Sequence, residues 1–416
     1  MLKLLVLADD FTGALDTGVK FADNGISTQV IAARSVDFTK ISSEIVVLVV
    51  DLQTRHQRPE VAYEVVYQIS KEAHQFGIPY ILKKTDSALR GNIGSELTAL
   101  YDATGRSILS FIPALPSMAR TTVNGIHLIE GIPVSESVFA KDPFTPVKHG
   151  AVSDIIKEQS AVRTHVASGE CIQINQEGIW IFDSETDADL LATAKKLQEK
   201  NLLAIMAGCS GIGAVLPEVL ELEGNRKRKY QQPERFVVIC GSVNPITTGQ
   251  VLYAEQEGFM HIALSLEEKM EATFWGTAHG QKRVREIVAL LNSDSKGLIS
   301  SFDQEPSDAT LEYGKQHGLT ATQVGACIAA SIGRLLKEMI AQGLNATFLV
   351  TGGDTLLGFM RQIDHYELDM ITEISPGSVL SQLSYKGQSH QIISKSGGFG
   401  SEDLLVEIAK KLNIKA

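Results

Sequence analysis

The chain contains 416 residues, which is the length of two or three domains rather than one. Hydrophobic residues make up 44% and charged residues 21%, so the chain has enough apolar material to build cores and is not disordered in bulk. Asp and Glu number 49 against 38 Lys and Arg, and the resulting net charge of −11 argues against a nucleic-acid partner or an anionic membrane surface.

The cysteines and the apolar runs point to a reducing, aqueous environment. Four cysteines lie far apart in the chain with no C-x-x-C pair, so neither a disulfide framework nor a structural zinc site is predicted; they are Cys171, Cys209, Cys240 and Cys327. The longest aliphatic run, at 45–50, is far too short to span a bilayer. We therefore expect a cytoplasmic protein with no membrane association.

The first half of the chain alternates short aliphatic runs with amphipathic stretches, a pattern typical of parallel strands covered by helices. It predicts strands at 3–8, 28–32, 45–51, 80–84 and 107–112 and helices at 13–24, 59–76 and 94–101. In open parallel sheets, ligands bind beyond the carboxyl ends of the strands. Charged residues follow three of these ends, at 9–10, 51–55 and 83–90, and these segments are the first candidates for a site.

The middle of the chain contains an irregular stretch and a linker. Residues 113–150 hold five of the 12 prolines and little helical periodicity, which predicts an extended excursion that serves as a lid or rim. A strand at 179–182, a helix at 187–199 and a strand at 202–207 follow. The polar, basic stretch 223–234 is the strongest linker signal, so we place the domains at 1–228 and 234–416.

A second α/β series follows the linker. Strands are predicted at 236–240, 261–264, 297–300 and 346–350, and the longest helix at 322–342. Thr320 and Gln323 have the spacing of a capping box at the start of this helix, and Gly343 can end it. The predicted fold is α/β, with two domains built on mainly parallel sheets and an active site in the inter-domain cleft.

Three strand-to-helix turns of the second half consist of small residues, at 241–245, 351–355 and 396–400. Such turns let backbone N–H groups meet a phosphate at a helix N-terminus. A single glycine pair is more often a tight turn with an Asp or Thr cap, but the recurrence indicates a nucleotide site. Glu402 and Asp403, expected in the first turn of the last helix, would repel a phosphate, so 397–400 is expected to border the nucleoside or the outer phosphates.

Two familiar phosphotransferase signatures are absent. The sequence contains neither the Walker pattern G-x-x-x-x-G-K-[ST] nor the H-R-D set of protein kinases. A phosphotransferase built on this chain would therefore be of another kind.

Charged segments of the first half suit a small acidic polyol. Lys84 and Arg90 could hold a substrate carboxylate, while Asp10 or Asp86 could orient a hydroxyl and take its proton. Arg55 and His56, which follow the third strand, would face the same crevice. The alternative is helix capping by the aspartates together with solvated surface charge.

Residues 208–213 resemble a dinucleotide-binding fingerprint, but Leu216 stands in the place of the third glycine, so a packing turn is favoured. This near-match motivates a nicotinamide-dependent dehydrogenase as the alternative enzyme class. A non-catalytic sugar-acid sensor is the alternative outside enzymes. Beside the turn, Cys209 follows an apolar run, which favours a buried thiol over a nucleophile.

Five separated motifs resemble the four-carbon acid sugar kinase family. They span both halves in the right order, at 9–16 (DDFTGALD), 84–92 (KTDSALRGN), 113–116 (PALP), 351–355 (TGGDT) and 396–400 (SGGFG). The resemblance implies an N-terminal domain that binds the sugar acid and a C-terminal domain that binds ATP. It also implies phosphorylation of the substrate's terminal hydroxyl at C4, with Mg²⁺ and ATP as cofactors.

The resemblance further implies which residues form the two sites. The sugar acid would meet Asp9, Asp10, Arg55, Lys84, Thr85, Asp86 and Ser87, with Arg90 nearby. ATP would meet Ser242, Asn244, Gly352, Gly353, Asp354, Thr355, Gly397, Gly398 and Gly400. In catalysis, Asp86 or Asp10 would act as base or orienter and Lys84 or Arg90 would fix the substrate, while the ligands of Mg²⁺ are not identified.

Members of the family act on D-threonate, D-erythronate or 3-oxo-tetronates. The stretch 141–150 (KDPFTPVKHG) looks more like the aldonate kinases than the oxo-tetronate kinases. We therefore expect phosphorylation of D-threonate to 4-phospho-D-threonate, with D-erythronate and 3-oxo-tetronates as alternatives. The sequence leaves a homo-oligomer open.

Overall fold

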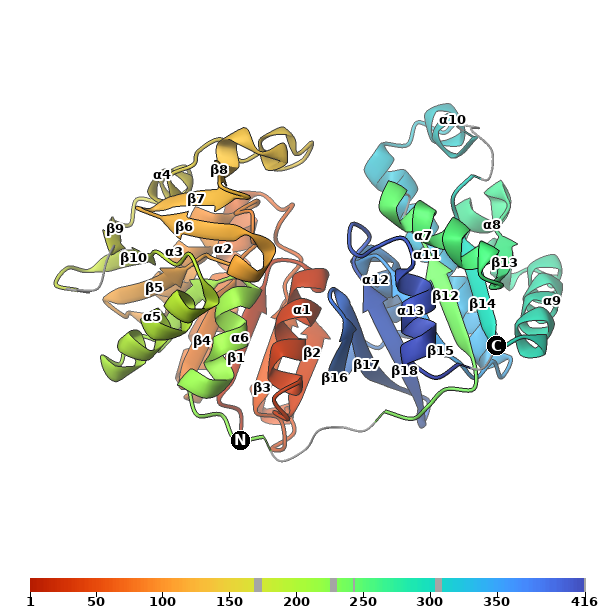
Figure 1. The fold of residues 1–416 in the computed structure, drawn as a ribbon, viewed down its shortest axis with the longest axis horizontal. Coiled ribbons are helices and arrows are strands. Elements are labelled where there is room, and N and C mark those ends of the chain that lie inside the picture. The colour runs from red at the N-terminus through yellow and green to blue at the C-terminus, as the bar shows by residue number, and fades with distance from the viewer. Residues whose placement is uncertain (168–173, 225–229, 242–243, 304–308, 415–416) are drawn as a thin grey trace. The chain divides into compact units, whose positions relative to one another are not determined.

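The computed structural model describes all residues except 168–173, 225–229, 242–243, 304–308 and 415–416 (Figure 1). The chain divides into two compact units, Met1–Lys227 and Arg228–Ala416. In both units strands alternate with helices along the chain, which confirms the predicted α/β class.

Eight strands of the first unit form a parallel arrangement in the order β2-β3-β1-β4-β11-β5-β10-β9. Their bounds are Leu4–Ala8 (β1), Thr28–Ala32 (β2), Val47–Asp51 (β3), Tyr80–Lys84 (β4), Ile108–Ile112 (β5), Thr164–Ala167 (β9), Gly178–Phe182 (β10) and Ile205–Gly208 (β11). The sequence analysis predicted all of these strands except β9. The central strands are buried throughout because helices cover both faces, which explains their continuous aliphatic sequences.

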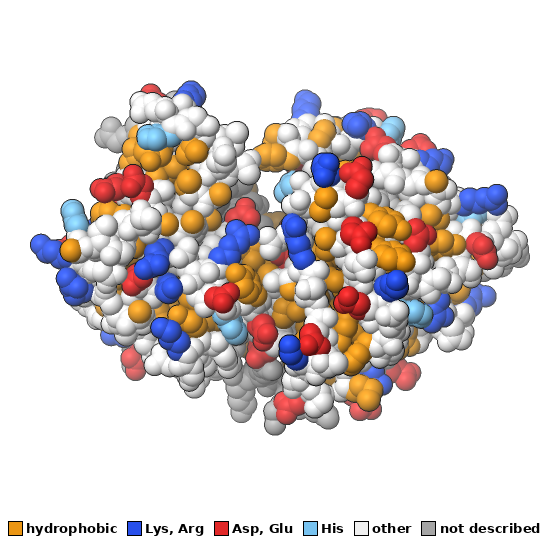
Figure 2. Space-filling model, turned by 180° about the vertical axis from the view of Figure 1, so that it is seen from behind, with side chains coloured by type: hydrophobic (Ala, Val, Ile, Leu, Met, Phe, Trp, Pro, Cys, Tyr) orange, Lys and Arg blue, Asp and Glu red, His pale blue; other side chains and the backbone are white. Residues whose placement is uncertain are grey.

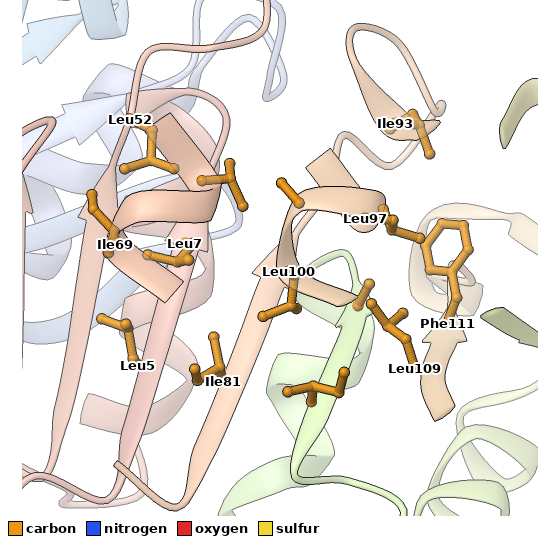
Figure 3. Close-up of a cluster of buried hydrophobic side chains, with 14 of the residues drawn as sticks. Leu5, Leu7, Leu52, Ile69, Ile81, Ile93, Leu97, Leu100, Leu109 and Phe111 are labelled. Atoms are coloured by element: carbon orange, nitrogen blue, oxygen red, sulfur yellow. The ribbon is translucent and has the colours of Figure 1, made fainter. Parts of the chain in front are cut away.

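Helices pack on both faces of these strands. Their bounds are Phe11–Ala22 (α1), Pro59–Phe76 (α2), Ile93–Thr104 (α3), Val152–Lys157 (α4), Asp187–Glu199 (α5) and Ser210–Val219 (α6), with a 3₁₀ turn at Phe38–Lys40. Figure 1 shows α1, α5 and α6 on one face and α2 and α3 on the other. On the α2 and α3 face, Leu5 and Leu7 of β1 belong to the same buried cluster as Ile69 of α2 and Leu97 and Leu100 of α3 (Figure 3).

The predicted excursion at 113–150 is more regular than expected. Arg120–Val123 (β6), Ile126–Ile129 (β7) and Ile132–Pro133 (β8) form an antiparallel sheet, with 3₁₀ turns at Pro116–Met118, Val134–Glu136 and Val138–Lys141. Asn124 and Gly125 connect β6 to β7, and both have positive φ, 51° and 72°. An Asn-Gly pair is a strong hairpin signal, so the sequence contained the information for this turn.

The strands of the second unit lie in the order β13-β14-β12-β15-β18-β17-β16. Their bounds are Phe236–Cys240 (β12), Met260–Ala263 (β13), Lys296–Ser300 (β14), Thr347–Thr351 (β15), Glu367–Ser375 (β16), Ser378–Tyr385 (β17) and Gln388–Lys395 (β18). The first five in this order are parallel, whereas β17 is antiparallel to both β18 and β16. The sequence analysis did not predict β16 and β17, whose tight turns at Gly377 and Gly387 have positive φ.

The helices of the second unit are Pro245–Gln256 (α7), Leu266–Met270 (α8), Ala278–Ser293 (α9), Ala309–Gln316 (α10), Ala321–Ala341 (α11), Gly353–Ile363 (α12) and Leu404–Lys411 (α13), with a 3₁₀ turn at Phe274–Gly276. Residues of α7 and α13 share one buried cluster with β12, β15 and β18. The predicted capping box of α11 is confirmed, because Thr320 and Gln323 exchange side-chain to backbone hydrogen bonds.

The distribution of charged side chains and the state of the cysteines can be compared with what the composition predicts. On the face drawn in Figure 2, basic and acidic side chains are interspersed rather than gathered into a basic tract. Within the described residues, no helix is long and apolar enough to cross a membrane. Cys209, Cys240 and Cys327 form no disulfide, and Cys171 lies outside the described residues.

Helices α11 and α12 approach each other closely through glycines. A Cβ at Gly333 of α11 would lie 2.4 Å from the carbonyl carbon of Gly358 and 2.5 Å from the amide nitrogen of Phe359, both in α12. Because backbone atoms of a packed helix cannot move aside easily, no larger residue fits here. By contrast, a Cβ at Gly325, in the same helix, would meet nothing within 4 Å.

Alanine substitutions at these two glycines of α11 should change the free energy of unfolding in opposite directions. We expect Gly333→Ala to lower the free energy of unfolding by about 1–3 kcal/mol through overpacking. Gly325→Ala should raise it by roughly 0.5–1 kcal/mol, because alanine favours the helix over the unfolded chain. Urea denaturation of both variants tests this, and equal effects would contradict the close helix contact.

Candidate active site

Three loops meet at the carboxyl edge of the first unit. Strand β1 lies between β3 and β4, so the residues that follow these strands are neighbours. Asp9 and Asp10 follow β1, Arg55 follows β3 shortly after its end, and Thr85 and Asp86 follow β4. The predicted crevice residues are therefore brought together by the parallel sheet itself.

Arg55 is the centre of this cluster. Its Nε lies 2.6 Å from Oδ2 of Asp9, its Nη1 and Nη2 lie 2.8 and 2.7 Å from the two carboxylate oxygens of Asp10, and Nη2 lies 3.5 Å from Oδ1 of Asp86. Burial alone would raise the pKa of Asp9, but Arg55 and Lys84 bring it below its ordinary value. All three aspartates are held around one buried guanidinium.

Lys84 is a second buried cation close to two of these aspartates. Its Nζ is 3.9 Å from Oδ1 of Asp9 and 3.8 Å from Oδ1 of Asp10. Burial would lower the pKa of Lys84, but the two aspartates raise it above its ordinary value, so the amine stays charged. Asp10 also caps α1 by accepting a hydrogen bond from the amide of Gly13, and a Cβ at Gly13 would lie only 2.1 Å from the Lys84 Nζ. A side chain at residue 13 would therefore displace the Lys84 ammonium from this position.

Asp86 and Arg90 form a two-point ion pair. Nε and Nη2 of Arg90 lie 2.8 and 3.0 Å from the carboxylate oxygens of Asp86, and Nη1 lies 3.1 Å from Oδ2 of Asp142. Burial would raise the pKa of Asp86, but Arg55 and Arg90 hold it far below its ordinary value. This carboxylate is a weak base at neutral pH and is better suited to orienting groups than to taking a proton.

Ser87 is held by residues of the β6–β7 hairpin. The guanidinium of Arg120 donates to the Ser87 hydroxyl, and Nε2 of His127 lies 2.9 Å from the Ser87 carbonyl oxygen. Nδ1 of His127 lies 3.1 Å from the Thr122 hydroxyl, its cross-strand partner. Burial lowers the pKa of His127 to about 4, so the ring is neutral and donates from Nε2 at neutral pH.

Arg120 was not predicted and differs from the other cations of the site. Arg55, Lys84 and Arg90 all face aspartates, whereas Arg120 has no carboxylate ion pair in the part of the chain that the structure describes. Its guanidinium packs over the ring of Phe139, with 5.3 Å between Cζ and the ring centroid. Burial lowers the pKa of Arg120. The guanidinium therefore retains hydrogen-bonding capacity for a substrate anion.

Residues 208–213 form a packing turn, as favoured by the sequence analysis. Strand β11 ends at Gly208 and α6 begins at Ser210, and a Cβ at Gly208 would lie 2.3 Å from the Ile112 carbonyl oxygen. The Cys209 thiol is buried and donates to the Pro113 carbonyl oxygen at 3.3 Å, and burial raises its pKa. In this environment the Cys209 thiol is expected to be unreactive and not to act as a nucleophile.

The cavity next to Arg55 has a volume of about 380 Å³. Polar residues of three segments line it, including His56, Asn92 and Lys148, and the ring of Phe144 packs against His56 with 5.6 Å between ring centroids. His56 therefore lies beside the aspartate cluster and not within it.

In the second unit, side chains of α7 hold the glycine turn at 396–400. Gln250, fully buried, donates from Nε2 to the carbonyl oxygens of Phe399, Gly400 and Ser401 at 2.9–3.1 Å. The Thr247 hydroxyl donates to the Gly397 carbonyl oxygen at 2.6 Å. Neither polar residue was predicted, because nothing local in the sequence marks a contact between segments 150 residues apart.

The turn at 241–245 lies next to both of the other glycine turns. A Cβ at Gly241 would lie 2.4 Å from the Thr355 Oγ1, and a Cβ at Gly398 would lie 3.7 Å from the Asn244 Nδ2. Asn244 caps α7, and Gly352, with a φ of 86°, precedes Gly353 at the start of α12. The Thr355 side chain is buried and that of Asp354 is exposed. Ser242 lies outside the described residues, and Glu402 and Asp403 precede α13 rather than forming its first turn.

Asp51, the last residue of β3, is a buried acid beside the aspartate cluster. One carboxyl oxygen accepts from the Gln53 amide at 3.1 Å, and the other has no hydrogen-bond partner in the described part of the chain. Burial raises the pKa of Asp51 to about 8, and the nearby Asp10 and Asp9 add to the effect. Folded Asp51 therefore keeps its proton at neutral pH.

Asp51→Asn should stabilise the protein in a pH-dependent way. The folded pKa lies above that of the unfolded chain, so the carboxyl's favourable contribution is complete below about pH 4 and is lost as the pH rises towards 8. An amide does not titrate, so we expect the variant to gain on the order of 1–3 kcal/mol at pH 7 and nothing near pH 4. Urea denaturation across this range measures the gap. A gap that does not change with pH, or an equal gain in the exposed control Asp154→Asn, would contradict this account.

Comparison with known proteins identifies the two units. A family model described as a sugar-binding N-terminal domain matches residues 4–216, and one described as a nucleotide-binding C-terminal domain matches residues 237–405. Solved structures of a Salmonella typhimurium protein and a Haemophilus influenzae protein share the fold, with TM-scores of 0.82 and 0.76, each at 21% identity. They cover 98% of this chain and 98% and 99% of their own chains.

Three curated relatives match over nearly the full length of the chain. A D-threonate kinase of Salmonella typhimurium is 26% identical, covering 98% of this chain and 97% of its own length. A D-erythronate kinase of Heliobacterium modesticaldum is 25% identical over 97% and 95%, and a 3-oxo-tetronate kinase of Haemophilus influenzae is 26% identical over 96% and 97%. Because the first family model alone covers more than half of the chain, and both models match in order, the chain belongs to the four-carbon acid sugar kinase family.

Proposed function

We propose that this kinase transfers the γ-phosphoryl group of ATP to the C4 hydroxyl of D-threonate, giving 4-phospho-D-threonate. The observation that carries the proposal is the buried cluster around Arg55, where cations and carboxylates from three loops surround a single position at the sheet edge. A short polyol with one carboxylate needs both kinds of group, because cations bind its acid end and carboxylates accept from its hydroxyls.

On the sugar-acid side, the predicted residues and Arg120 receive separate tasks. Lys84, Arg90 and Arg120 would hold the substrate carboxylate, and Arg120 is favoured for this task because no aspartate competes for it among the described residues. Asp10 would orient the C4 hydroxyl, because its side chain is 28% exposed while that of Asp86 is 7% exposed. Asp9, Arg55 and Asp86 would hold these groups in place, and Thr85 and Ser87 would complete the wall of the site.

On the nucleotide side, the kinases among the relatives imply ATP, and the three turns would hold it. Asn244 and Ser242, residues 352–355 and residues 397–400 would surround the triphosphate and nucleoside. Within the described residues, no three His, Cys, Asp or Glu side chains group closely enough to hold a metal alone. The lack of such a group among the described residues fits an Mg²⁺ ion that is carried by the nucleotide, since this ion is usually held by phosphates, waters and one or two carboxylates. Bound there, Mg²⁺ would neutralise phosphate charge.

Transfer would then depend on positioning. The C4 hydroxyl oxygen attacks the γ-phosphorus in line while the bond from that phosphorus to the β–γ bridging oxygen breaks, so that ADP leaves and the hydroxyl proton passes to the Asp10 carboxylate. Binding both substrates in the required geometry lowers most of the barrier. The mechanism therefore requires the sugar-acid site and the three turns to face one another across a closed, water-excluding space during transfer.

The segment 141–150 favours D-threonate over the 3-oxo-tetronates, because its sequence resembles that of the aldonate kinases. Asp142 in this segment pairs with Arg90, and its other oxygen accepts from the amides of Phe144 and Thr145 at 2.9 Å. The segment is thus tied to the end of the site where the sugar acid is proposed to bind. A dehydrogenase is not supported, because residues 208–213 pack against backbone instead of opening towards a dinucleotide.

A substrate panel tests the activity and the substrate together. We expect ADP release with ATP, Mg²⁺ and D-threonate, with a kcat/KM higher than that for D-erythronate or the 3-oxo-tetronates. A higher value for another of these acids would replace D-threonate as the substrate. No ADP release with any four-carbon acid would favour the sugar-acid sensor instead.

Variants of the two aspartates separate their roles. Asp10→Asn should lower kcat about 10²–10⁴-fold with little change in ATP affinity, and it should destabilise the protein less than Asp86→Asn, because the Asp10 side chain is more exposed and asparagine can still cap α1. Asp86→Asn should lower kcat much more than ATP affinity and should also destabilise the protein, because Arg90 and Arg55 lose a buried partner. Steady-state kinetics and urea denaturation give both readouts, and unchanged turnover in either variant would remove that aspartate from the mechanism.

A further inference from the structure

Four polar or polarisable residues form a row across the ends of neighbouring strands in the second unit. Thr351 of β15 pairs with Cys240 of β12 on one side and with Lys395 of β18 on the other, and Ser378 of β17 pairs with Lys395. Residues paired across a sheet point to the same face. Ile393, two residues before Lys395, belongs to the buried cluster shared with α7 and α13, so the Lys395 side chain points to the α7 face.

Lys395 is a buried cation without an acidic partner. Its side chain belongs to a residue only 1% exposed, and its Nζ donates to the Ser396 carbonyl oxygen at 2.8 Å. Among the described residues, no carboxylate forms an ion pair with it. The other buried lysines among the described residues differ, because Lys83 pairs with Glu96, Lys84 with Asp9 and Asp10, and Lys269 with Asp303. An unpaired buried charge is costly, so its retention calls for a physical reason.

The groups beside Lys395 also lack partners. The hydroxyls of Thr351 and Ser378 are buried and make no hydrogen bond to any described residue. Burial lowers the pKa of Lys395 to about 8, so the amine is still charged at neutral pH. The cation has no acidic partner and the two hydroxyls have no hydrogen-bond partner among the described residues, and an anion with several oxygens would satisfy all three groups.

The position of Lys395 links it to the glycine turns. Its carbonyl oxygen accepts from the Gly352 amide at 2.8 Å, and the turn 397–400, fixed by Thr247 and Gln250, follows it directly. We propose that the Lys395 ammonium and the Thr351 hydroxyl bind the phosphates of the nucleotide from beneath the glycine turns. This inference rests on the proposed function and adds a cation, which none of the three turns contains.

The rival explanation is structural, with Lys395 serving to hold the Ser396 carbonyl oxygen. The two explanations predict opposite effects on the nucleotide-free protein. A structural lysine stabilises the fold, so its removal should destabilise it. A buried lysine whose role is to bind a ligand destabilises the ligand-free fold. Replacing it by an apolar residue of similar length should therefore leave the stability of the nucleotide-free protein equal or higher.

The test measures binding and stability of the full chain for Lys395→Met. Titration calorimetry with ATP, ADP and adenosine should show a loss of about 10- to 100-fold in affinity for ATP and ADP and none for adenosine. Thermal unfolding without nucleotide should give a Tm equal to or above that of the wild type. The matched control is Lys337→Met, since the Lys337 Nζ also donates to a single backbone carbonyl oxygen, that of Gln362 at 2.7 Å, away from the turns. It should leave all three affinities unchanged.

Thr351→Val provides a second measurement that does not depend on the charge. It removes an unpartnered hydroxyl without changing the shape of the side chain, so it should fold and should weaken ATP binding several-fold while leaving adenosine binding unchanged. Unchanged ATP affinity in Lys395→Met would overturn the inference. Equal losses for ATP and adenosine with a lowered Tm would also overturn it, in favour of the structural explanation. If Lys395→Met does not fold, unchanged ATP affinity in Thr351→Val overturns it. Failure of the wild type to bind ATP would instead overturn the proposed function.

Discussion

The pairing of Arg55 with three aspartates is the interaction on which the sugar-acid site depends. Asp9, Asp10 and Asp86 come from two different loops, and their like charges could not share one buried place without the guanidinium between them. The planar, forked donor set of arginine matches two carboxylates at once, which a lysine could not do. The interaction fixes the loops after β1, β3 and β4 relative to one another. It thereby holds the partly exposed Asp10 and the neighbouring cations in position before any substrate arrives.

Sequence alone could predict this cluster because topology determines it. Once β1 is taken as a central parallel strand, the segments after β1, β3 and β4 must be neighbours, and Asp9, Arg55 and Lys84 follow from their distance to the strand ends. A different signal predicts the turns around Gly241, Gly352 and Gly397, namely small residues between a predicted strand and a predicted helix. What topology does not determine is which cation is left without a carboxylate, since that depends on side-chain pairing in three dimensions.

The residues that sequence reasoning missed act over long separations or sit in irregular segments. Arg120 and His127 reach Ser87 only because an Asn-Gly turn folds part of the predicted excursion into a hairpin. Gln250 binds carbonyl groups about 150 residues away in the sequence. Lys395 stands out only once the structure shows that its side chain is buried. The strands β16 and β17 escaped prediction because their sequences mix polar and apolar residues, as befits an antiparallel meander rather than a covered parallel strand.

The central claim is that a sugar acid held by the first unit receives a phosphoryl group from a triphosphate held by the second. A crystal structure with D-threonate and a non-hydrolysable ATP analogue tests it most directly. The account predicts the substrate carboxylate on the cations beside Arg55, and the C4 oxygen on Asp10 at about 3–3.5 Å from the γ-phosphorus. A ternary complex with both ligands bound at these residues but with the C4 oxygen directed away from the triphosphate would contradict it.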